Sequence, residues 1–306
     1  MSLVSPLIVI VGPTAVGKTD LAIELALRLR GEVVSADSRL FYRGMDIGTA
    51  KPSLTERRGV PHHLIDVAEP DETWSLALFQ QRAQTAIEGI YRRGNLPLLV
   101  GGTGQYIRAV TQGWVPPEVQ PHPDLRNILE NLAKTHDPYW LHAKLRVLDP
   151  IAADSIDPRN LRRTIRALEV ILTTGYPFSA QKRSSGSPYH LITLGLKRPR
   201  EELYRRIDER IEAMFANGLL EEVQRLLQRG YSPDLPSMSA IGYREAAAVL
   251  RGEMSLEAAK TQMKRLTRIF VRRQANWFKE TDPAIHWLDA RQIDLEELER
   301  YIRQNL

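Results

Sequence analysis

The segment Gly12–Thr19 constrains the fold more than any other part of the chain. It reads GPTAVGKT and fits the pattern G-x-x-x-x-G-K-[ST], in which a glycine-rich loop presents backbone N–H groups to phosphates. The run Leu7–Val11 before it is apolar and rich in β-branched residues, which predicts a buried parallel strand. The apolar periodicity after it predicts a helix over 18–30. A strand, this loop and a helix in this order favour a phosphate-binding loop over a glycine turn that binds nothing.

The residue types in the loop indicate what it binds. Its two glycines permit a backbone that turns its N–H groups inward, and the following helix N-terminus adds partial positive charge. Lys18 supplies a cation for terminal phosphoryl oxygens, and Thr19 supplies a hydroxyl ligand for Mg²⁺. We therefore expect Mg²⁺ and a di- or triphosphate, ATP among them, although the motif does not specify the reaction. The expected binding residues are Gly12, Pro13, Thr14, Ala15, Val16, Gly17, Lys18 and Thr19.

Further elements predict an α/β fold. Val33–Ala36 and Leu96–Val100 have the composition of strands, and 75–93 has that of a helix between them. This alternation predicts a P-loop core with a parallel sheet flanked by helices. The first of these two strands ends in Asp37, which could hold Mg²⁺ through water, as in P-loop NTPases, or serve another purpose. The second ends in glycines followed by Thr103.

The chain changes character after Trp114. Four prolines between 116 and 123 indicate a boundary, 124–180 has few strand signals, and 189–196 has the composition of a strand again. We therefore predict a core formed by 1–115 and 188–306 and a helical insertion domain at 116–187. Within the core, C-terminal helices are expected at 200–216, 219–229, 242–251 and 255–279.

The distribution of charge is more informative than its sum, which is only +5. From Lys260 to Lys279 there are seven basic residues and no acidic one, and Arg159–Arg166 holds four arginines and no acid. Both segments are candidate phosphate-contacting surfaces. The chain has no cysteine, which excludes disulfides, thiolate zinc sites and a cysteine nucleophile. The first apolar run is too short for a signal or membrane-spanning helix, so we expect a cytoplasmic protein with no membrane partner.

The segment Ser35–Pro52, which reads SADSRLFYRGMDIGTAKP, resembles the signature of bacterial tRNA dimethylallyltransferases of the IPP transferase family. The resemblance runs in order from about residue 7 to residue 279. The other segments that carry it are Gly12–Thr19, Pro61–Asp66, Leu99–Tyr106, Arg166–Val170 and Ile241–Arg244.

The resemblance implies a prenyl-transferring enzyme. Its reaction would move a dimethylallyl group from dimethylallyl diphosphate to N6 of adenosine 37 in tRNAs that read codons beginning with U, giving N6-(dimethylallyl)adenosine and diphosphate. The implied cofactor is Mg²⁺, and the implied partner is the anticodon stem-loop of tRNA, contacted in part by the insertion domain. The family fold is a P-loop core with a helical insertion, and the chain is expected to be a monomer.

The resemblance also implies three catalytic residues. An exocyclic adenine amine is a poor nucleophile and calls for a base, a role that falls on Asp37. The departing diphosphate needs electrostatic stabilisation, for which the family pattern supplies Thr103 near the bridging oxygen and Arg210 on the phosphates. Each has a structural alternative: a strand-end carboxylate for Asp37, a helix N-cap for Thr103 and a solvated ion-pair face for Arg210.

The RNA contacts follow from the same resemblance. Arginines and Tyr243 would reach splayed bases, which is how single-stranded loops are read. The pair His62–His63 is expected to be structural. Two other functions stay open: a small-molecule kinase of the P-loop class and an RNA-binding module without catalysis. The residues expected to contact tRNA are Asp37, Ser38, Arg39, Leu40, Thr103, Arg126, Arg162, Arg163, Thr164, Ile165, Arg166, Ser239, Ala240, Ile241, Gly242, Tyr243 and Arg244.

Overall fold

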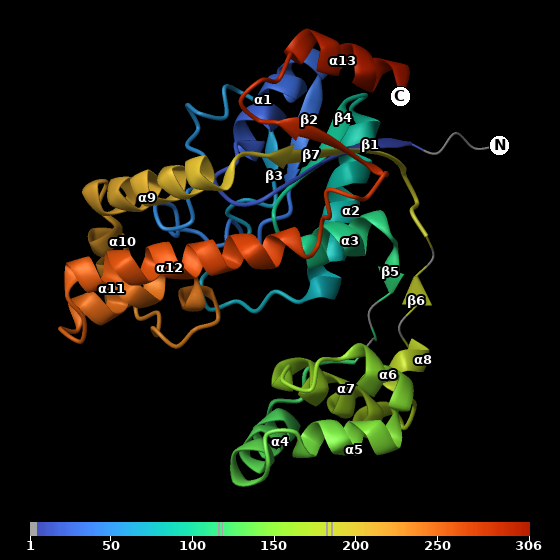
Figure 1. The fold of residues 1–306 in the computed structure, drawn as a ribbon, viewed down its shortest axis with the longest axis vertical. Helices are drawn as coiled ribbons and strands as arrows, with labels where there is room; N and C mark the ends of the chain where they lie inside the picture. The colour runs from blue at the N-terminus through green and yellow to red at the C-terminus, as the bar shows by residue number, and fades with distance from the viewer. Residues whose placement is uncertain (1–4, 116, 118, 182, 185) are drawn as a thin grey trace. The chain divides into compact units, whose positions relative to one another are not determined.

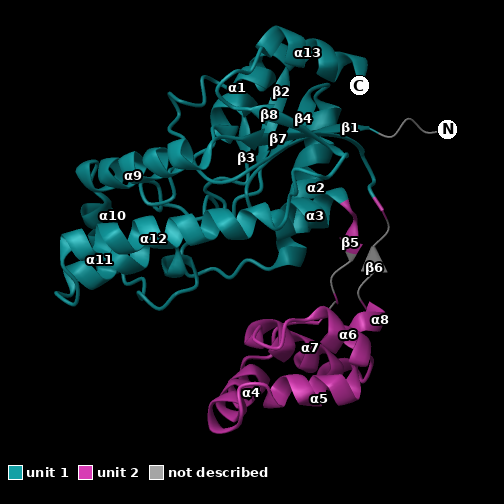
Figure 2. Cartoon of the chain, viewed as in Figure 1, with its two compact units in different colours: residues 1–111, 187–306 teal, residues 112–186 magenta. Residues whose placement is uncertain are grey.

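The computed structural model describes residues 5–115, 117, 119–181, 183–184 and 186–306. Figures 1 and 2 show that the chain divides into two compact units. Unit 1 comprises Met1–Thr111 and Ser187–Leu306, and unit 2 comprises Gln112–Gly186. These divisions lie a few residues from the boundaries expected at 115 and 188, and residue 116 itself is outside the described residues.

Unit 1 is built on a six-stranded sheet in the order β3-β2-β4-β1-β7-β8, with every neighbouring pair parallel. The central strand β1 lies between β4 and β7, so that Ile8 is opposite both Leu98 and Ile192. A parallel strand covered on both faces has no polar side, which explains the continuous apolar run at Leu7–Val11. The strands are β1 (Pro6–Val11), β2 (Gly31–Ser35), β3 (His62–His63), β4 (Leu96–Val100), β7 (His190–Lys197) and β8 (Ile285–Asp289).

Helices cover this sheet and confirm the expected α/β class. Helix α1 buries Leu21, Ala22, Leu25 and Ala26, which the apolar periodicity places on one face together with the half-buried Leu29. The chain passes from β1 to β2 and then back to β4, so right-handed crossovers put α1 and α2 on opposite faces of the sheet. The helices of unit 1 are α1 (Lys18–Leu29), α2 (Leu76–Arg92), α3 (Gly104–Thr111), α9 (Arg200–Ala216), α10 (Leu219–Gln228), η1 (Ser237–Ser239), α11 (Tyr243–Leu250), α12 (Leu256–Ala275) and α13 (Leu295–Gln304).

The sequence patterns did not predict β3, β8 or α13. Strand β3 has only two residues, too few for a detectable alternation, and β8 pairs with β7 at the far edge of the sheet. Because β1, β2, β4 and β7 are parallel, the loops that follow them meet at the same edge. That edge therefore gathers Gly12–Thr19, Asp37 and Thr103.

Unit 2 is helical and has its own core. Leu145, Ala167 and Leu168 are among its fully or almost fully buried residues. Its elements are β5 (Trp114–Val115), α4 (Pro123–Thr135), α5 (Trp140–Leu148), α6 (Pro150–Ser155), α7 (Leu161–Thr174), α8 (Phe178–Gln181) and β6 (Arg183–Ser184), with β5 and β6 antiparallel. Within the described residues of both units, no helix combines the length and the apolarity that a membrane span requires.

Candidate functional site

The loop Gly12–Thr19 joins β1 to α1, and other segments of unit 1 hold it in place. Gly12 has φ +146°, and a Cβ there would lie 2.7 Å from the carbonyl oxygen of Leu196, so this position requires glycine. The Nε of Arg206 donates to the carbonyl of Ala15 at 2.9 Å. A loop fixed in this way is preorganised, so a phosphate does not have to order it on binding.

Lys18 supplies a half-buried cation to this loop. Its Nζ donates to the carbonyls of Pro13 at 2.7 Å and Gly12 at 3.1 Å. Burial lowers the pKa of Lys18 to about 8, with Asp37 raising it and Arg210 lowering it. A phosphate in the loop would favour the charged form, because an opposite charge at short range raises the pKa of an amine.

Two cavities meet beside the loop. The smaller measures about 140 Å³, and Lys18 and Thr19 are among its lining residues. The larger measures about 630 Å³ and extends among α9, α11 and α12. The residues that line both cavities are Thr14, Ala15, Asp37, Thr49, Ala50 and Arg210.

The larger cavity has the lining of a site for a small apolar group with a few polar contacts. Its polar side chains include Thr103 and Ser239. Its apolar side chains come mainly from two helices. They are Ile207, Ile211 and Met214 of α9 and Met263, Leu266, Ile269 and Phe270 of α12.

Asp37 lies two residues after the end of β2 and in the wall shared by the two cavities. Its Oδ1 accepts the backbone N–H of Arg39 at 3.0 Å, which forms a local turn. The other carboxylate oxygen, Oδ2, takes part in no hydrogen bond among the described residues. The structural and the functional interpretations of Asp37 are therefore compatible, because Oδ1 orders the turn and the residue also lines both cavities.

Thr103 lines the larger cavity immediately before α3, and its carbonyl accepts the N–H groups of Tyr106 and Ile107. Beside it, Gln274 of α12 is buried and bridges two loops. Its Oε1 accepts the N–H of Thr14 at 2.9 Å, and its Nε2 donates to the carbonyl of Gly102 at 3.1 Å. Sequence reasoning missed Gln274, because its partners lie 260 and 172 positions away and no local pattern marks it.

Arg210 of α9 lines both cavities. Burial lowers the pKa of Arg210, Arg206 one turn earlier lowers it further, and Asp20 raises it. Arg210 forms no ion pair among the described residues, which disfavours the solvated ion-pair face as its environment. Two neighbouring guanidinium groups with so little compensating charge favour an anion in the smaller cavity.

The side chain of Arg39 joins two segments that line the larger cavity. Its Nη1 donates to the carbonyls of Pro236 at 2.9 Å and Ser237 at 3.3 Å, and its Nη2 donates to Ser239 at 3.3 Å. These bonds connect the turn after β2 to η1. Around that turn Ser38, Ser239, Ala240, Ile241 and Arg244 line the larger cavity, and Leu40 lines the smaller one.

Tyr243 requires a correction to its expected role. Its side chain is 0% exposed, so the ring offers no surface to a base. The hydroxyl donates to Glu222 at 2.5 Å, and the same carboxylate accepts the backbone N–H groups of Asp46, Ile47 and Gly48. Tyr243 and Glu222 therefore anchor the 46–48 segment, and any contact of Tyr243 with RNA would come from its backbone.

The arginines expected to contact RNA in unit 2 fall into two groups, those that are ion-paired and those that are exposed. Arg126 and Arg166 both bind Glu169, which is 0% exposed, at 2.8 Å and 2.6 Å. Burial raises the pKa of Glu169, but hydrogen bonds from Arg126, the His122 N–H and Arg166 outweigh it and bring the pKa to about 2.

Of the remaining residues on α7, Arg162 and Arg163 are exposed. Thr164 and Ile165 are buried, at 1% and 4% exposure, so their side chains face the core of unit 2. Contacts with RNA on this helix would therefore come from the two exposed arginines rather than from the whole 162–166 segment.

The parallel sheet, the loop after its central strand and the cations around that loop define the chain as a P-loop α/β protein. The adjoining larger cavity combines apolar side chains of α9 and α12 with charged ones such as Arg244 and Glu245. The family model described as IPP transferase matches residues 40–281. The chain therefore belongs to the IPP transferase family.

Individual relatives support this assignment. The tRNA dimethylallyltransferase of Roseiflexus sp. (strain RS-1) is 54% identical over 292 residues, which cover 95% of each chain. That of Thermomicrobium roseum is 52% identical over 94% of this chain and 87% of its own.

Two solved structures are also similar. The tRNA isopentenylpyrophosphate transferase of Bacillus halodurans is 43% identical with a TM-score of 0.73, covering 98% of this chain and 96% of its own. A eukaryotic dimethylallyltransferase acting on tRNA is 30% identical with a TM-score of 0.81, covering 97% of this chain and 78% of its own.

Proposed function

We propose that this chain transfers a dimethylallyl group from dimethylallyl diphosphate to N6 of adenosine 37 in tRNAs that read codons beginning with U. Transfer of dimethylallyl to tRNA is the activity of its relatives at about half identity over nearly the whole chain. The roles of individual residues are assigned from one observation, which is that the two cavities share a wall. Asp37 and Arg210 lie there, between the phosphate-binding loop and the apolar lining.

The donor end of the site stabilises the leaving group. The loop 12–19 and Lys18 would hold the diphosphate, and Arg210 would neutralise charge that develops as the C–O bond loosens. Thr103 would donate a hydrogen bond near the bridging oxygen. An allylic carbon tolerates cationic character, so stabilising the departing diphosphate is most of the catalytic task.

The acceptor end needs a base for the adenine amine. Asp37 would take the proton from N6 as the new C–N bond forms, since its carboxylate borders the same cavity as the apolar lining. The apolar residues of α9 and α12 would enclose the dimethylallyl group and exclude water, which would otherwise compete with the amine for the allylic carbon.

The donor atoms present fit a Mg²⁺ ion that is shared with the diphosphate. Thr19 and Asp37 both line the smaller cavity, and Mg²⁺ commonly takes only one or two protein ligands beside phosphate and water. No group of three or more histidine and acidic side chains that could hold a metal is found among the described residues. Bound there, the ion would neutralise the charge of the diphosphate. Mg²⁺ and ATP binding stay predictions.

The RNA-binding residues are proposed according to their exposure and their place in the cavity. Ser38, Ser239 and Arg244 line the larger cavity and would contact the anticodon loop directly. Arg162 and Arg163 of the helical unit would contact phosphates of the anticodon stem-loop. That the protein acts as a cytoplasmic monomer stays a prediction.

Incubation with labelled dimethylallyl diphosphate, Mg²⁺ and unmodified tRNA tests the proposal. We expect nucleoside mass analysis to find N6-(dimethylallyl)adenosine and mass mapping of tRNA oligonucleotides to place it at position 37 only. Phosphoryl transfer from ATP to a small acceptor, with no prenylated nucleoside, would instead support a P-loop kinase. Binding of tRNA without any diphosphate binding would support an RNA-binding module.

A further inference from the structure

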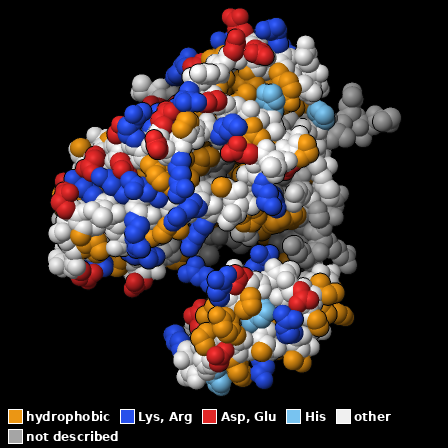
Figure 3. Space-filling model, in the orientation of Figure 1, with side chains coloured by type: hydrophobic (Ala, Val, Ile, Leu, Met, Phe, Trp, Pro, Cys, Tyr) orange, Lys and Arg blue, Asp and Glu red, His pale blue; other side chains and the backbone are white. Residues whose placement is uncertain are grey.

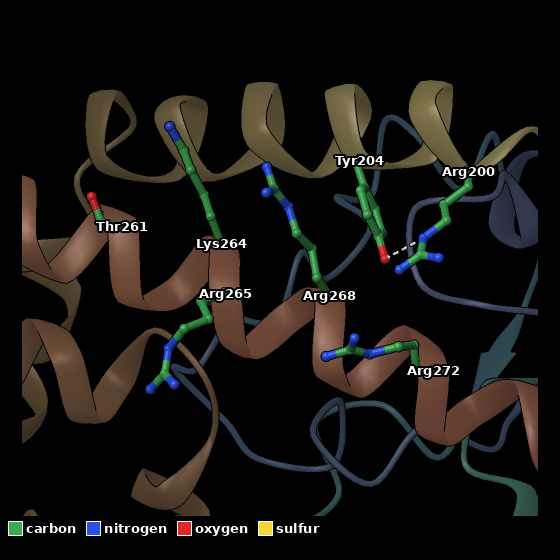
Figure 4. Close-up of a pocket in the computed structure, with 7 residues that line it drawn as sticks. All are labelled: Arg200, Tyr204, Thr261, Lys264, Arg265, Arg268 and Arg272. Carbon is green, nitrogen blue, oxygen red and sulfur yellow. Dashed lines mark hydrogen bonds between the residues drawn. The ribbon is translucent and has the colours of Figure 1, made fainter.

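A second concave surface of unit 1 is not explained by the two cavities of the site. It is a groove of about 350 Å³ between α9 and α12 (Figure 4), and we call it the α9–α12 groove. Figure 3 shows Lys and Arg side chains gathered over these two helices. Five of the seven lining residues are basic. They are Arg200, Tyr204, Thr261, Lys264, Arg265, Arg268 and Arg272.

The charges along the groove follow from the register of two antiparallel helices. Lys260 and Lys264 both bind Glu212, at 2.9 Å and 2.6 Å, and Arg268 binds Asp208 at 2.6 Å. Bases on α12 and acids on α9 thus recur every four residues and pair in order. Paired charges of this kind are an ordinary feature of adjacent helices and need no ligand.

The alternation breaks at one end of the groove. One turn before Asp208, α9 carries Tyr204, and a further turn back it carries Arg200. On α12 the next base, Arg272, therefore has no acid in the expected register. The ion pairs of the described residues do not include Arg200, Arg265 or Arg272, so three cations of the groove are uncompensated.

Tyr204 brings two of the cations together. The guanidinium carbons of Arg200 and Arg268 lie 5.2 Å and 5.0 Å from its ring centroid, and the ring lies between them in Figure 4. The Nε of Arg200 also donates to the tyrosine hydroxyl at 2.8 Å. The ring therefore fixes the uncompensated guanidinium of Arg200 beside the ion-paired Arg268, and Arg200 would stabilise an anion in the groove.

The groove is separate from the substrate cavity. At 100° per residue, the α12 residues that line the groove (261, 264, 265, 268 and 272) lie on one face of the helix. The α12 residues that line the larger cavity, such as Met263, Phe270 and Gln274, lie on the opposite face. Arg273 lines the cavity and its neighbour Arg272 lines the groove, so basic side chains lead from one to the other.

We propose that the α9–α12 groove binds backbone phosphates of tRNA next to the nucleotide that enters the larger cavity. This inference rests on the proposed function, which supplies the RNA. The positions from 261 to 272 extend over roughly 16 Å of helix at ~1.5 Å per residue, which is longer than one phosphate or diphosphate. A chain of phosphodiesters fills such a groove, and guanidinium groups suit phosphate oxygens because they bind them in a bidentate way.

The salt dependence of tRNA binding tests the groove in the full chain. Each lost phosphate contact reduces the slope of log Kd against log salt by roughly 0.7–0.9. We expect the double variant Arg200→Gln/Arg272→Gln to bind tRNA more weakly, with a slope smaller by roughly 1.4–1.8. Arg200→Lys/Arg272→Lys keeps both charges and should keep most of the slope.

A matched control removes two charges elsewhere. Arg92 and Arg205 have side chains 80% and 70% exposed, and neither lines a described cavity. Arg92→Gln/Arg205→Gln should keep the wild-type Kd and slope. If the groove variant also keeps the wild-type slope, or if the control loses as much as the groove variant, the inference is wrong.

Two further outcomes distinguish a groove for the tRNA backbone from a small-anion site and from failure of the proposed function. If the groove variant loses a second inorganic diphosphate seen by calorimetry on the wild type but keeps the tRNA slope, the groove is a small-anion site and the inference fails. If the wild type makes no prenylated tRNA, the proposed function fails. An active wild type with an unchanged slope in the variant rejects the groove alone.

Discussion

At the scale of single residues, individual side chains of the site serve two purposes each. Asp37 orders the turn after β2 through Oδ1, and it borders both the smaller and the larger cavity. Lys18 is similar, because it is bound to its own loop and also provides a cation to the smaller cavity. Substitutions at these two positions separate the structural contribution of a side chain from its contribution to chemistry.

Asp37→Asn should keep the fold and the binding of both substrates, because the amide is nearly isosteric. If Asp37 is the base, the single-turnover transfer rate should fall by roughly 10²–10⁴-fold at every Mg²⁺ concentration. The measurement uses saturating donor and tRNA across a Mg²⁺ series. Recovery of the rate at high Mg²⁺ would show that Asp37 orders the metal instead, and wild-type turnover throughout would reject both roles.

Binding of dimethylallyl diphosphate should weaken as pH rises above about 8, the pKa of Lys18 in the free chain. Bound diphosphate raises this pKa, so above pH 8 binding takes up a proton, and affinity falls by up to about tenfold per pH unit. Calorimetric titration from neutral to alkaline pH measures this dependence.

Lys18→Met is the control for that titration. Lys18→Met should bind the donor weakly, and its affinity should not decline at alkaline pH. Lys18→Ala should also bind the donor weakly but keep its affinity for tRNA in a gel shift. A flat wild-type profile, or an equal loss of donor and tRNA binding in the alanine variant, would indicate that Lys18 is a structural residue of the loop.

At the scale of secondary-structure elements, α12 connects the parts of the site. It lines the larger cavity with Met263 and Phe270, and Gln274 joins the loop at Thr14 to the turn at Gly102. Thr103 follows that turn directly. The position of a proposed catalytic side chain is therefore set by a helix more than a hundred residues away in the sequence.

Gln274→Met should preserve the volume of the side chain but remove both hydrogen bonds. We expect the single-turnover rate to fall by roughly 10–100-fold, as for a displacement of about 1 Å in a catalytic group. Gln262→Met provides a matched change on the same helix, at a half-buried glutamine that binds Glu245. Equal effects of the two variants on rate would show a general disturbance of α12 rather than a positioning role.

At the scale of the whole molecule, the chain consists of two units with separate cores. Unit 2 depends on Glu169, whose carboxylate is fully buried and bound by Arg126 and Arg166. Because the pKa of Glu169 is lowered to about 2, its stabilising effect is complete above the ordinary glutamate pKa and is lost as pH falls toward 2. Acid should therefore destabilise unit 2.

Glu169→Gln tests whether the two units fold independently of each other. It should lower the free energy of unfolding of unit 2 by roughly 1–3 kcal/mol while leaving the Kd for dimethylallyl diphosphate unchanged. Thermal unfolding followed by proteolysis between the units gives the measurement, and Glu130→Gln, at an exposed position of α4, is the control. Loss of donor binding in Glu169→Gln would mean that the units do not fold independently.

The sequence by itself determined the fold class and the position of the glycine-rich loop that we propose binds the donor. The apolar run at 7–11, the loop Gly12–Thr19 and the helix after it are contiguous, so local periodicity and residue type are enough to predict them. The helices of 200–275 were predicted to within one residue for the same reason, except that the last one ends at Ala275, four residues before the predicted end at 279. The family resemblance added the catalytic assignments, which spacing alone left open.

Only the tertiary structure decided which side chains share a cavity and which are buried. It shows that Tyr243 is a buried partner of Glu222, that Gln274 bridges two distant loops, and that the bases of α12 divide between ion pairs, cavity and groove. None of these follows from local patterns, because each depends on contacts between segments far apart in the chain. Burial and electrostatic environment are set by those contacts, and a residue's position in the sequence does not encode them.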